Sequence, residues 1–189
     1  MMIGHRELVA AIVSEIAASG PIPFLRFMDL ALYHPQFGYY MRPATAGSER
    51  IGWSGDFYTS SDVHPMLGQG LAKQARQIDA LLGHPDPFTV LEMGPGKGLL
   101  ARDFLRAMLK DHDSLAHRLK LVLVERSPAM RDLQRRHLHE WCQGGLVTWV
   151  EDLDSVPSSG VTGLLFSNEL PDAFPVHRIQ IAGGQVHEI

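Results

Sequence analysis

One stretch limits what this chain can fold into more than any other, namely residues 89–98, TVLEMGPGKG. A short apolar run typical of a β-strand contains an acidic residue, Glu92, near its end, and glycines follow at three alternate positions. Residues 99–105, LLARDFL, then have the spacing of a helix. Glycine permits positive φ angles and close approach of a ligand, and a helix that starts from such a loop points its free N–H groups at that ligand. We therefore expect a nucleotide-type loop at the carboxyl end of a parallel strand, where open α/β sheets bind their ligands.

The spacing of the glycines indicates which nucleotide this loop would hold. The dinucleotide fingerprint is G-x-G-x-x-G, whereas Gly94, Gly96 and Gly98 form G-x-G-x-G, with Glu92 two positions before the first glycine. This arrangement resembles motif I of the class I S-adenosylmethionine (SAM) methyltransferases, in which the loop lies against the amino-acid end of the cofactor. The alternative is a glycine-rich strand-to-helix turn without a ligand.

Composition and charge argue against several classes of partner. The 189 residues suffice for one domain with an extension. A formal net charge of -4 argues against a broad electrostatic grip on nucleic acid, and no apolar run approaches the ~20 residues of a membrane span. The single cysteine, Cys142, suits a reducing compartment, and the N-terminus has no secretory signal pattern. We therefore expect a cytoplasmic protein. We also expect no metal site, since no Cys/His spacing suggests one.

Apolar patterns predict the order of the elements. Two helices are expected at 3–19 and from Pro23 to the residue before His34, and a loop of small polar residues at 44–52. A third helix is expected from Val63 to about Leu82, with Ser61 or Asp62 as its cap and Met66 among its inward residues. Strand and helix then alternate, which is typical of a parallel sheet. The later predictions are strands at 121–124, 146–150 and 161–166, a helix capped by Ser127 and running to about Trp141, and a hairpin from 176–181 and 185–189.

Several stretches together resemble one family, the MidA-like methyltransferases, which include a mitochondrial complex I assembly factor with arginine methyltransferase activity. The matching stretches are 20–40 (GPIPFLRFMDLALYHPQFGYY), 55–60 (GDFYTS), 90–98 (VLEMGPGKG), 124–128 (VERSP) and 168–175 (NELPDAFP). The glycine loop is shared by all class I methyltransferases, whereas the first, second and last stretches are more specific.

The resemblance implies an α/β fold, a Rossmann-like, doubly wound class I SAM methyltransferase sheet with an N-terminal helical extension. Family members are about twice as long, and their sheets have seven strands, so the sheet is expected to be truncated after the fourth strand. The expected division is a helical extension and substrate-side region at 1–83, a partial SAM-binding core at 84–175 and a hairpin at 176–189. Because the fourth strand would be an exposed edge, we expect it to be covered by a loop, a swapped hairpin or a partner, such as a second copy in a homodimer.

The cofactor SAM carries an ammonium, a carboxylate, a ribose diol and an adenine, and each of them needs a different protein group. Glu92 is placed to reach the ammonium, and Glu125, which follows the next strand, to accept hydrogen bonds from the ribose, as the equivalent acid does in dinucleotide sites. Asp152 and Leu153 follow the third strand and would border the adenine, although Asp152 also fits an ordinary cap. The full set of predicted cofactor-binding residues is Glu92, Gly94, Pro95, Gly96, Gly98, Glu125, Arg126, Asp152, Leu153 and Asn168.

The predicted catalytic residues follow the fourth strand, on the methyl side of the cofactor. Asn168 and Glu169 lie there, and a carboxylate can bind a guanidinium through two hydrogen bonds, which favours arginine over adenine as the methyl acceptor. Asp56 is a further candidate and Asp172 another, although aspartate at such positions is often a turn or cap residue.

Three hypotheses on function follow. The first is a SAM-dependent protein arginine methyltransferase that, by resemblance, modifies a subunit of respiratory complex I, in the cytoplasm or, for eukaryotic relatives, in the mitochondrial matrix. The second is a non-catalytic, methyltransferase-like assembly or binding module. The third, an NAD-type dehydrogenase, is disfavoured by the glycine spacing and by Pro95.

Overall fold

The computed structural model describes residues 4–42, 51–110, 114–156 and 160–189. The chain divides into two compact units. One comprises residues 43–168 and contains the main sheet, and we call it the sheet unit. The other combines residues 1–42 with 169–189, and we call it the helix–hairpin unit.

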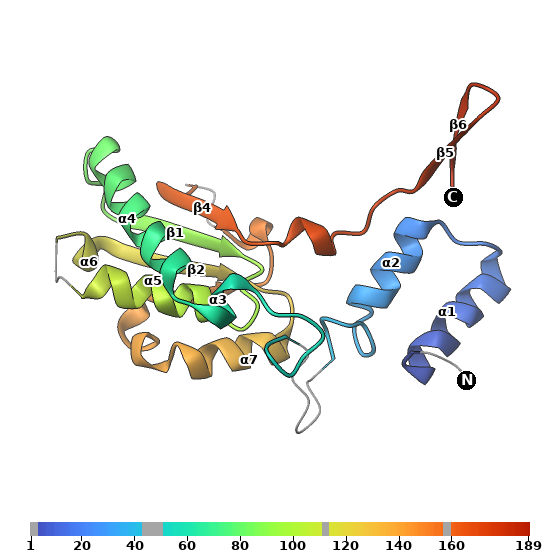
Figure 1. Cartoon of the computed structure of the whole chain (residues 1–189), viewed down its shortest axis with the longest axis horizontal. Helices are drawn as coiled ribbons and strands as arrows, with labels where there is room; N and C mark the ends of the chain where they lie inside the picture. Colours follow the sequence, from blue (N-terminus) through green and yellow to red (C-terminus); the bar gives the residue numbers. More distant parts are fainter. Residues whose placement is uncertain (1–3, 43–50, 111–113, 157–159) are drawn as a thin grey trace. The chain divides into compact units, whose positions relative to one another are not determined.

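The sheet unit is built on four parallel strands in the order β3-β2-β1-β4 (Figure 1). Their bounds are β1 Phe88–Met93, β2 Leu119–Val124, β3 Val147–Val150 and β4 Gly163–Ser167. The chain runs outward from β1 to β3 and then returns to place β4 on the other side of β1, so the strand order reverses between β1 and β4. In open α/β sheets ligands bind at the carboxyl ends of the strands beside such a reversal.

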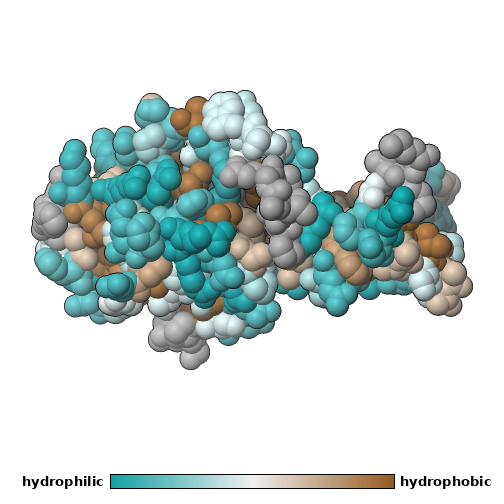
Figure 2. Space-filling view, turned by 90° about the horizontal axis from the view of Figure 1, so that it is seen from below, coloured by the Kyte–Doolittle hydropathy of each residue, from teal (hydrophilic) through white to brown (hydrophobic). Residues whose placement is uncertain are grey.

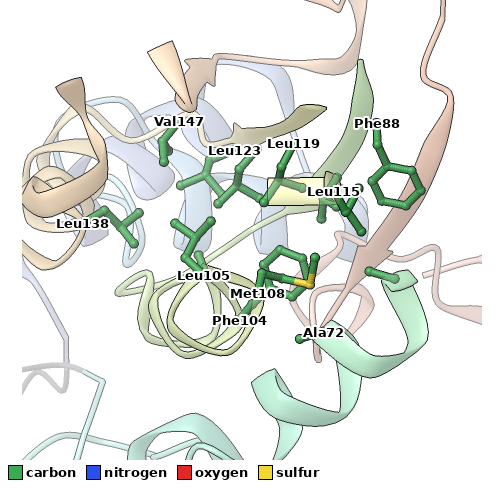
Figure 3. Packing of buried hydrophobic residues seen from close by; sticks show 14 residues of the cluster. Ala72, Phe88, Phe104, Leu105, Met108, Leu115, Leu119, Leu123, Leu138 and Val147 are labelled. Carbon is green, nitrogen blue, oxygen red and sulfur yellow. The ribbon is translucent and has the colours of Figure 1, made fainter. Parts of the chain in front are cut away.

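Helices α4 (Met66–Leu81), α5 (Leu99–Leu109) and α7 (Pro128–His137) belong to the same unit, with the short helices α3 (Ser60–Val63) and α6 (Ser114–Arg118). The apolar face of α5 packs against alternate residues of β1 and β2, as expected when successive strand residues point to opposite faces. Figure 3 shows this core around Phe104, Leu105 and Met108, each of which is at most 1% exposed. Helix α4 approaches α5 closely because Gly68 has no side chain: a Cβ there would lie 2.7 Å from the Phe104 nitrogen.

The segment before α4 differs from the sequence prediction. Two helices replace the single expected one, because Pro65 lacks an N–H and disfavours helical backbone at the residue before it; His64 is accordingly extended. Thr59, rather than Ser61 or Asp62, occupies the cap position, and its N–H donates to the Asp62 carboxylate at 2.9 Å. The prediction that Met66 faces inward was wrong, since this side chain is 70% exposed.

Other predicted elements are confirmed with shifted ends. The helix capped by Ser127 ends at His137, and a short 3-10 helix, η1 (His139–Trp141), completes the segment that was predicted as helical to Trp141. Most of the predicted loop at 44–52 lies outside the described residues. The unit boundaries also differ from the expected division, because residues 43–83 group with the sheet and the hairpin groups with the N-terminal helices.

The helix–hairpin unit contains α1 (Arg6–Ser19), α2 (Phe24–Tyr33) and the antiparallel strands β5 (Ile179–Ala182) and β6 (Gln185–Glu188). The hairpin is confirmed, and its two-residue turn has φ values of 59° at Gly183 and 78° at Gly184, as a type I′ turn requires. The N–H of Phe24 donates to the Ile189 carbonyl at 2.8 Å, which ties the hairpin to α2.

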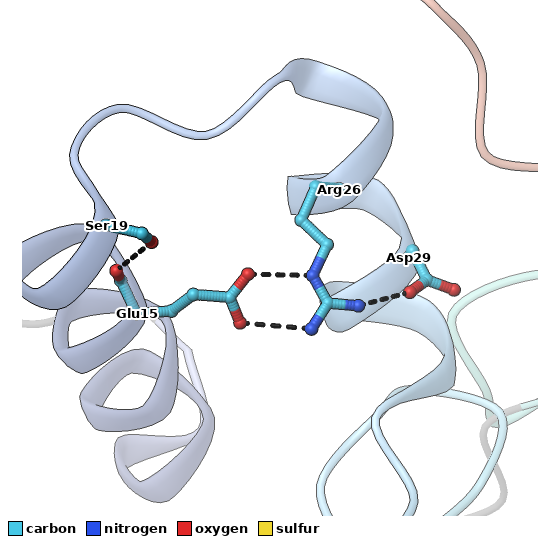
Figure 4. A network of polar contacts seen from close by, with 4 residues as sticks. All are labelled: Glu15, Ser19, Arg26 and Asp29. Atoms are coloured by element: carbon cyan, nitrogen blue, oxygen red, sulfur yellow. Dashed lines mark hydrogen bonds and ion pairs between the residues drawn. The ribbon is translucent and has the colours of Figure 1, made fainter.

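Polar contacts join the two helices of this unit. Arg26 on α2 donates to Glu15 on α1 at 2.8 and 3.0 Å and to Asp29 at 2.8 Å (Figure 4).

Apolar side chains reach the surface of both units (Figure 2). None of the helices within the described ranges is both long and apolar enough to cross a membrane.

Candidate functional site

The glycine loop lies directly after β1, as the sequence predicted. Gly94, Gly96 and Gly98 have φ values of 62°, 53° and 79°, in the left-handed region that favours glycine. The Gly94 N–H continues the strand ladder by donating to the Val124 carbonyl at 3.0 Å, and the Gly98 N–H donates to the carbonyl of the buried Pro95 at 2.8 Å. Gly98 is also the N-cap of α5, so the loop leads straight into the free N–H groups at the start of that helix.

The space beside the loop is open at Gly96. A Cβ built there would meet no heavy atom of the described residues within 4 Å, whereas one at Gly98 would lie 3.2 Å from Cγ of Gln134. Gly96 is therefore required for its backbone conformation, and Gly98 both for its conformation and for its packing on α7.

Glu92 lies beneath this loop and is 2% exposed. It continues the buried face of β1 that contains Phe88 and Val90, and it pairs in register with Leu123. Within the described residues its Oε2 atom has no hydrogen-bond partner. Burial raises the pKa of Glu92 to about 8. An unpartnered buried carboxyl oxygen is costly, and a cationic group at this position would offset that cost.

Glu125 follows β2 and is held in place by two donors. The Ser127 N–H donates to its Oε1 at 2.8 Å and the Gln134 amide to its Oε2 at 3.1 Å. Burial raises the pKa of Glu125, and the hydrogen bonds from Ser127 and Gln134 act in the opposite direction. A carboxylate has about four acceptor positions, so Glu125 can accept a further hydrogen bond from a ligand.

Helix α7 begins where the sequence predicted. The Ser127 hydroxyl accepts from the Met130 N–H at 3.4 Å, and Pro128 occupies the first turn, where its missing N–H costs nothing. This start orients the helix so that one side chain of its second turn, Gln134, reaches the glycine loop.

Gln134 was not among the residues predicted from the sequence. Its amide nitrogen donates to the Glu125 carboxylate and, at 2.7 Å, to the Gly96 carbonyl. These two hydrogen bonds join two predicted parts of the site. A signal for it exists, because Gln134 lies four residues after Met130 and four before the fully buried Leu138. A polar residue in the apolar stripe of a helix needs a buried partner.

Lys97 and its partners were also missed. The Lys97 ammonium pairs with the Asp62 carboxylate at 2.5 Å, with both side chains largely buried, and the His137 ring bonds the Lys97 carbonyl at 2.8 Å. Burial opposes ionisation of Asp62, but the hydrogen bonds from Lys97 and Thr59 outweigh it and lower the pKa of this residue. The loop is therefore anchored from α3 on one side and from α7 on the other.

The residues predicted to border an adenine follow β3. Asp152 is the N-cap of the 3-10 helix η3 (Leu153–Ser155), and its Oδ1 accepts from the Ser155 N–H and hydroxyl at 2.9 and 2.6 Å. The alternative role as a cap is thus observed, and binding of a ligand stays a prediction. Leu153 is 44% exposed, and Arg126 is exposed next to Glu125.

The predicted catalytic residues belong to both units. Asn168 is half-buried just past β4 and is the last residue of the sheet unit, whereas Glu169 is the first residue of the returning segment in the helix–hairpin unit. Glu169 has a φ of 56°, which is uncommon for a residue other than glycine and marks a sharp change of chain direction. Asp56 is exposed in the segment before α3. Their catalytic roles stay predictions.

The assembled part of the site therefore comprises the glycine loop, Glu92 below it and Glu125 beside it. It offers backbone N–H groups, an unpartnered carboxyl oxygen and a positioned carboxylate, which suits a ligand with a cationic end and a diol. Among the described residues no group of three or more His, Cys, Asp or Glu side chains could hold a metal ion.

This chain is similar to known proteins over most of its length. The model of a family described as "putative S-adenosyl-L-methionine-dependent methyltransferase" matches residues 70–189. A Drosophila melanogaster protein named protein arginine methyltransferase NDUFAF7 homolog, mitochondrial, is 31% identical over 98% of this chain and 45% of the relative. The Danio rerio protein of corresponding name is 26% identical over 93% of this chain and 44% of the relative.

A solved structure shows the same fold. A crystal structure of a candidate methyl transferase from Burkholderia thailandensis, bound to S-adenosyl-homocysteine, superposes with a TM-score of 0.78 at 30% identity. The match covers 96% of this chain and 45% of the other. The chain thus spans somewhat less than half the length of the relatives it matches.

Proposed function

The chain belongs to this family of S-adenosyl-L-methionine-dependent methyltransferases, and from that premise we propose that it binds SAM at the carboxyl ends of β1 and β2 for transfer of a methyl group to an arginine side chain of a protein. The observation that carries the proposal is the buried Glu92 carboxyl, whose Oε2 has no partner among the described residues, beneath a glycine loop with open space at Gly96.

The residues present fit the chemical groups of SAM. Glu92 would hold the ammonium, the N–H groups at the start of α5 the carboxylate, and Glu125 the ribose hydroxyls. When bound, SAM supplies a methyl group on a sulfonium, which a nucleophile displaces in line. The protein's contribution is therefore to fix the donor and acceptor and to exclude water between them.

The proposed acceptor is the guanidinium of an arginine. Glu169 is the candidate carboxylate for it because two parallel hydrogen bonds would fix the plane of the guanidinium and leave one nitrogen free. Asn168 and Asp56 are the further candidates. The names of the Drosophila and zebrafish relatives support protein arginine as the substrate. Following the family resemblance, we propose a respiratory complex I subunit as the target.

The proposed location is the cytoplasm, in keeping with the single cysteine; the relatives just named are mitochondrial proteins. A second candidate function is a non-catalytic binding module. It is favoured by one observation: β4 is the last strand in the order of the main sheet, so the described residues form no sheet beyond it on the acceptor side.

Cofactor binding is tested by titrating S-adenosyl-homocysteine into the native chain and two variants by calorimetry. Glu125→Ala should weaken binding about tenfold or more, because a hydrogen-bonded charged group is lost. Glu140→Ala removes a half-exposed acid of η1 and serves as the matched control, with affinity unchanged. A native chain that binds no S-adenosyl-homocysteine would overturn the proposal.

The acceptor is tested by mass spectrometry of arginine residues in complex I subunits after incubation with the full-length enzyme and SAM. Methylarginine that is lost with Glu169→Gln, while S-adenosyl-homocysteine affinity is retained, supports an arginine methyltransferase with Glu169 at the acceptor. Cofactor binding without any methylarginine would favour the binding module.

A further inference from the structure

We propose that Gln134 is a positioning residue that sets the glycine loop and Glu125 in the geometry that binds the cofactor, and that Trp149 fixes the orientation of its amide. This inference rests on the proposed function and adds to it two residues outside the recognisable sequence motifs.

Gln134 has three neighbours from three different segments. Its Nε2 donates to the Gly96 carbonyl at 2.7 Å and to Glu125 Oε2 at 3.1 Å, and its Oε1 accepts from the Trp149 indole N–H at 2.9 Å. The residue is 0% exposed, so water does not compete for these bonds. A single side chain of α7 thus links the loop after β1, the acid after β2 and a residue of β3.

The chemistry of Trp149 decides which way the amide faces. An indole N–H can only donate, so it must meet the oxygen of the Gln134 amide and not the nitrogen. The NH₂ group is then left facing two acceptors, and it has one hydrogen for each. Arg135 lies over the Trp149 ring at 5.1 Å from its centroid and packs on the indole from outside.

The bond to Gly96 orients the peptide that joins it to Lys97. In a planar trans peptide the C=O and the following N–H point in opposite directions. Because the Gly96 carbonyl points toward Gln134, the Lys97 N–H points away from α7. His137 holds the next carbonyl, that of Lys97, at 2.8 Å, so α7 fixes two successive peptides of the loop.

The bond to Glu125 selects one position of its carboxylate. Ser127 holds one oxygen and Gln134 the other, and the donated hydrogen bonds favour the ionised form against the effect of burial. An ionised carboxylate accepts from two hydroxyls, as the ribose diol requires. Arg131, on the same helix, favours the ionised form as well.

Other side chains would not replace glutamine here. Glutamate has the same shape but would place an oxygen against the Gly96 carbonyl and Glu125. Leucine would leave the Trp149 N–H, the Gly96 carbonyl and Glu125 Oε2 without this partner. Gln134 also packs on Gly98: a Cβ at Gly98 would lie 3.2 Å from Cγ of Gln134, so a side chain there would push against Gln134.

The test is a double-mutant cycle on S-adenosyl-homocysteine affinity, with Gln134→Leu and Glu125→Ala alone and together. Gln134→Leu should weaken binding about tenfold or more in the native background, and by about threefold or less when Glu125 is already alanine. Trp149→Phe, which removes the indole N–H and leaves a smaller aromatic ring in its place, should weaken binding about two- to fivefold. If Gln134→Leu fails to fold, Trp149→Phe still tests the proposal, because it leaves the Gln134 side chain in place.

Leu138→Val is the control for general destabilisation. This substitution shortens a fully buried core side chain just past α7, and an aliphatic side chain forms no hydrogen bond with the loop. The Kd of Leu138→Val for S-adenosyl-homocysteine should therefore stay within about twofold of the native value. Additive effects in the cycle would overturn the positioning role through Glu125, as would native affinity in Gln134→Leu. If the native chain itself binds no S-adenosyl-homocysteine, it is the proposed function that fails, which separates the two results.

Discussion

The two units of this protein differ in how their residues are buried. In the sheet unit, a set of side chains drawn from β1, β2, α4 and α5 is 0–2% exposed and forms one continuous core. In the helix–hairpin unit, α1 has no buried residue, every residue of β5 and β6 is exposed, and Leu30 is the buried residue of α2. The predicted cofactor site therefore rests on the unit with a buried core, whereas the other unit is held by half-exposed aromatic contacts, hydrogen bonds and ion pairs. Segments of the second kind open at low free energy.

The largest expected difference in the free energy of unfolding is between alanine variants of one phenylalanine in each unit. Phe104→Ala should lower the free energy of unfolding by about 3–5 kcal/mol, because Phe104 is 1% exposed and its loss leaves a cavity. Phe27→Ala should cost less than about 1.5 kcal/mol, because Phe27 is 45% exposed. Urea unfolding measures both. Equal losses would contradict the contrast between the units.

The next largest difference in stability is expected between two arginine–carboxylate pairs of similar geometry. Arg118 donates to Asp79 at 2.8 and 2.9 Å, and these side chains are 15% and 5% exposed. Arg26 and Glu15 form the corresponding pair in Figure 4, with side chains 43% and 32% exposed. Asp79→Ala should cost about 3 kcal/mol, since it leaves a largely buried charge without this partner, and Glu15→Ala at most about 1 kcal/mol.

The pH dependence of the Asp79 contribution has a definite sign. Hydrogen bonds from Arg118 lower the pKa of Asp79 against the effect of burial, and His84 adds to them. The stabilisation is therefore present at neutral pH and is lost as the pH falls through the lowered pKa. A difference between native protein and Asp79→Ala that stayed constant down to strongly acidic pH would contradict this assignment.

A pH dependence of the opposite sign is expected at Glu92. Its pKa is raised by burial from 4.5 to about 8, so the folded state holds a proton that the unfolded state releases between these values. The native protein should therefore lose up to about 1.4 kcal/mol of stability per pH unit as the pH rises through this interval. Glu92→Gln should flatten this part of the profile, whereas Leu138→Val should shift the profile without changing its slope. Chemical denaturation at a series of pH values measures the slopes, and parallel native and Glu92→Gln profiles would count against the buried carboxyl.

The last comparison concerns alanine variants of two glycines with similar backbones. Gly96 has a φ of 53° and Gly183 a φ of 59°, and a Cβ at either would meet no described atom within 4 Å. Alanine should cost about 1–2 kcal/mol at each, the price of left-handed backbone. Only Gly96→Ala should also weaken binding of S-adenosyl-homocysteine, about tenfold or more, by filling space beside the loop. Calorimetry on both variants checks this, and an equal loss of affinity from Gly183→Ala would break the distinction between the units.

Much of the fold was predictable from local sequence. The run of apolar residues before Glu92, the glycines after it and the Ser127-Pro128 start of α7 each specify their own structure through backbone conformation and hydrogen bonds between neighbours. The hairpin turn at Gly183-Gly184 is of the same kind. The break at Pro65 was also visible in the sequence, but the cap expected at Ser61 or Asp62 placed the start of one long helix before this proline. In the structure only the helix after Pro65 contributes buried residues to the core.

The sequence by itself determined the α/β class, the order of its elements and the place of the glycine loop, because these depend on residues close to one another in the chain. Only the tertiary structure decided that Gln134 joins Gly96 to Glu125, that Asp62 holds Lys97, and that the hairpin groups with the N-terminal helices. Such contacts join residues tens of positions apart, and whether a polar side chain is buried beside a suitable partner depends on how the helices pack. As a result of that packing, Gln134 supports the glycine loop from α7, and Lys97 anchors the loop to α3.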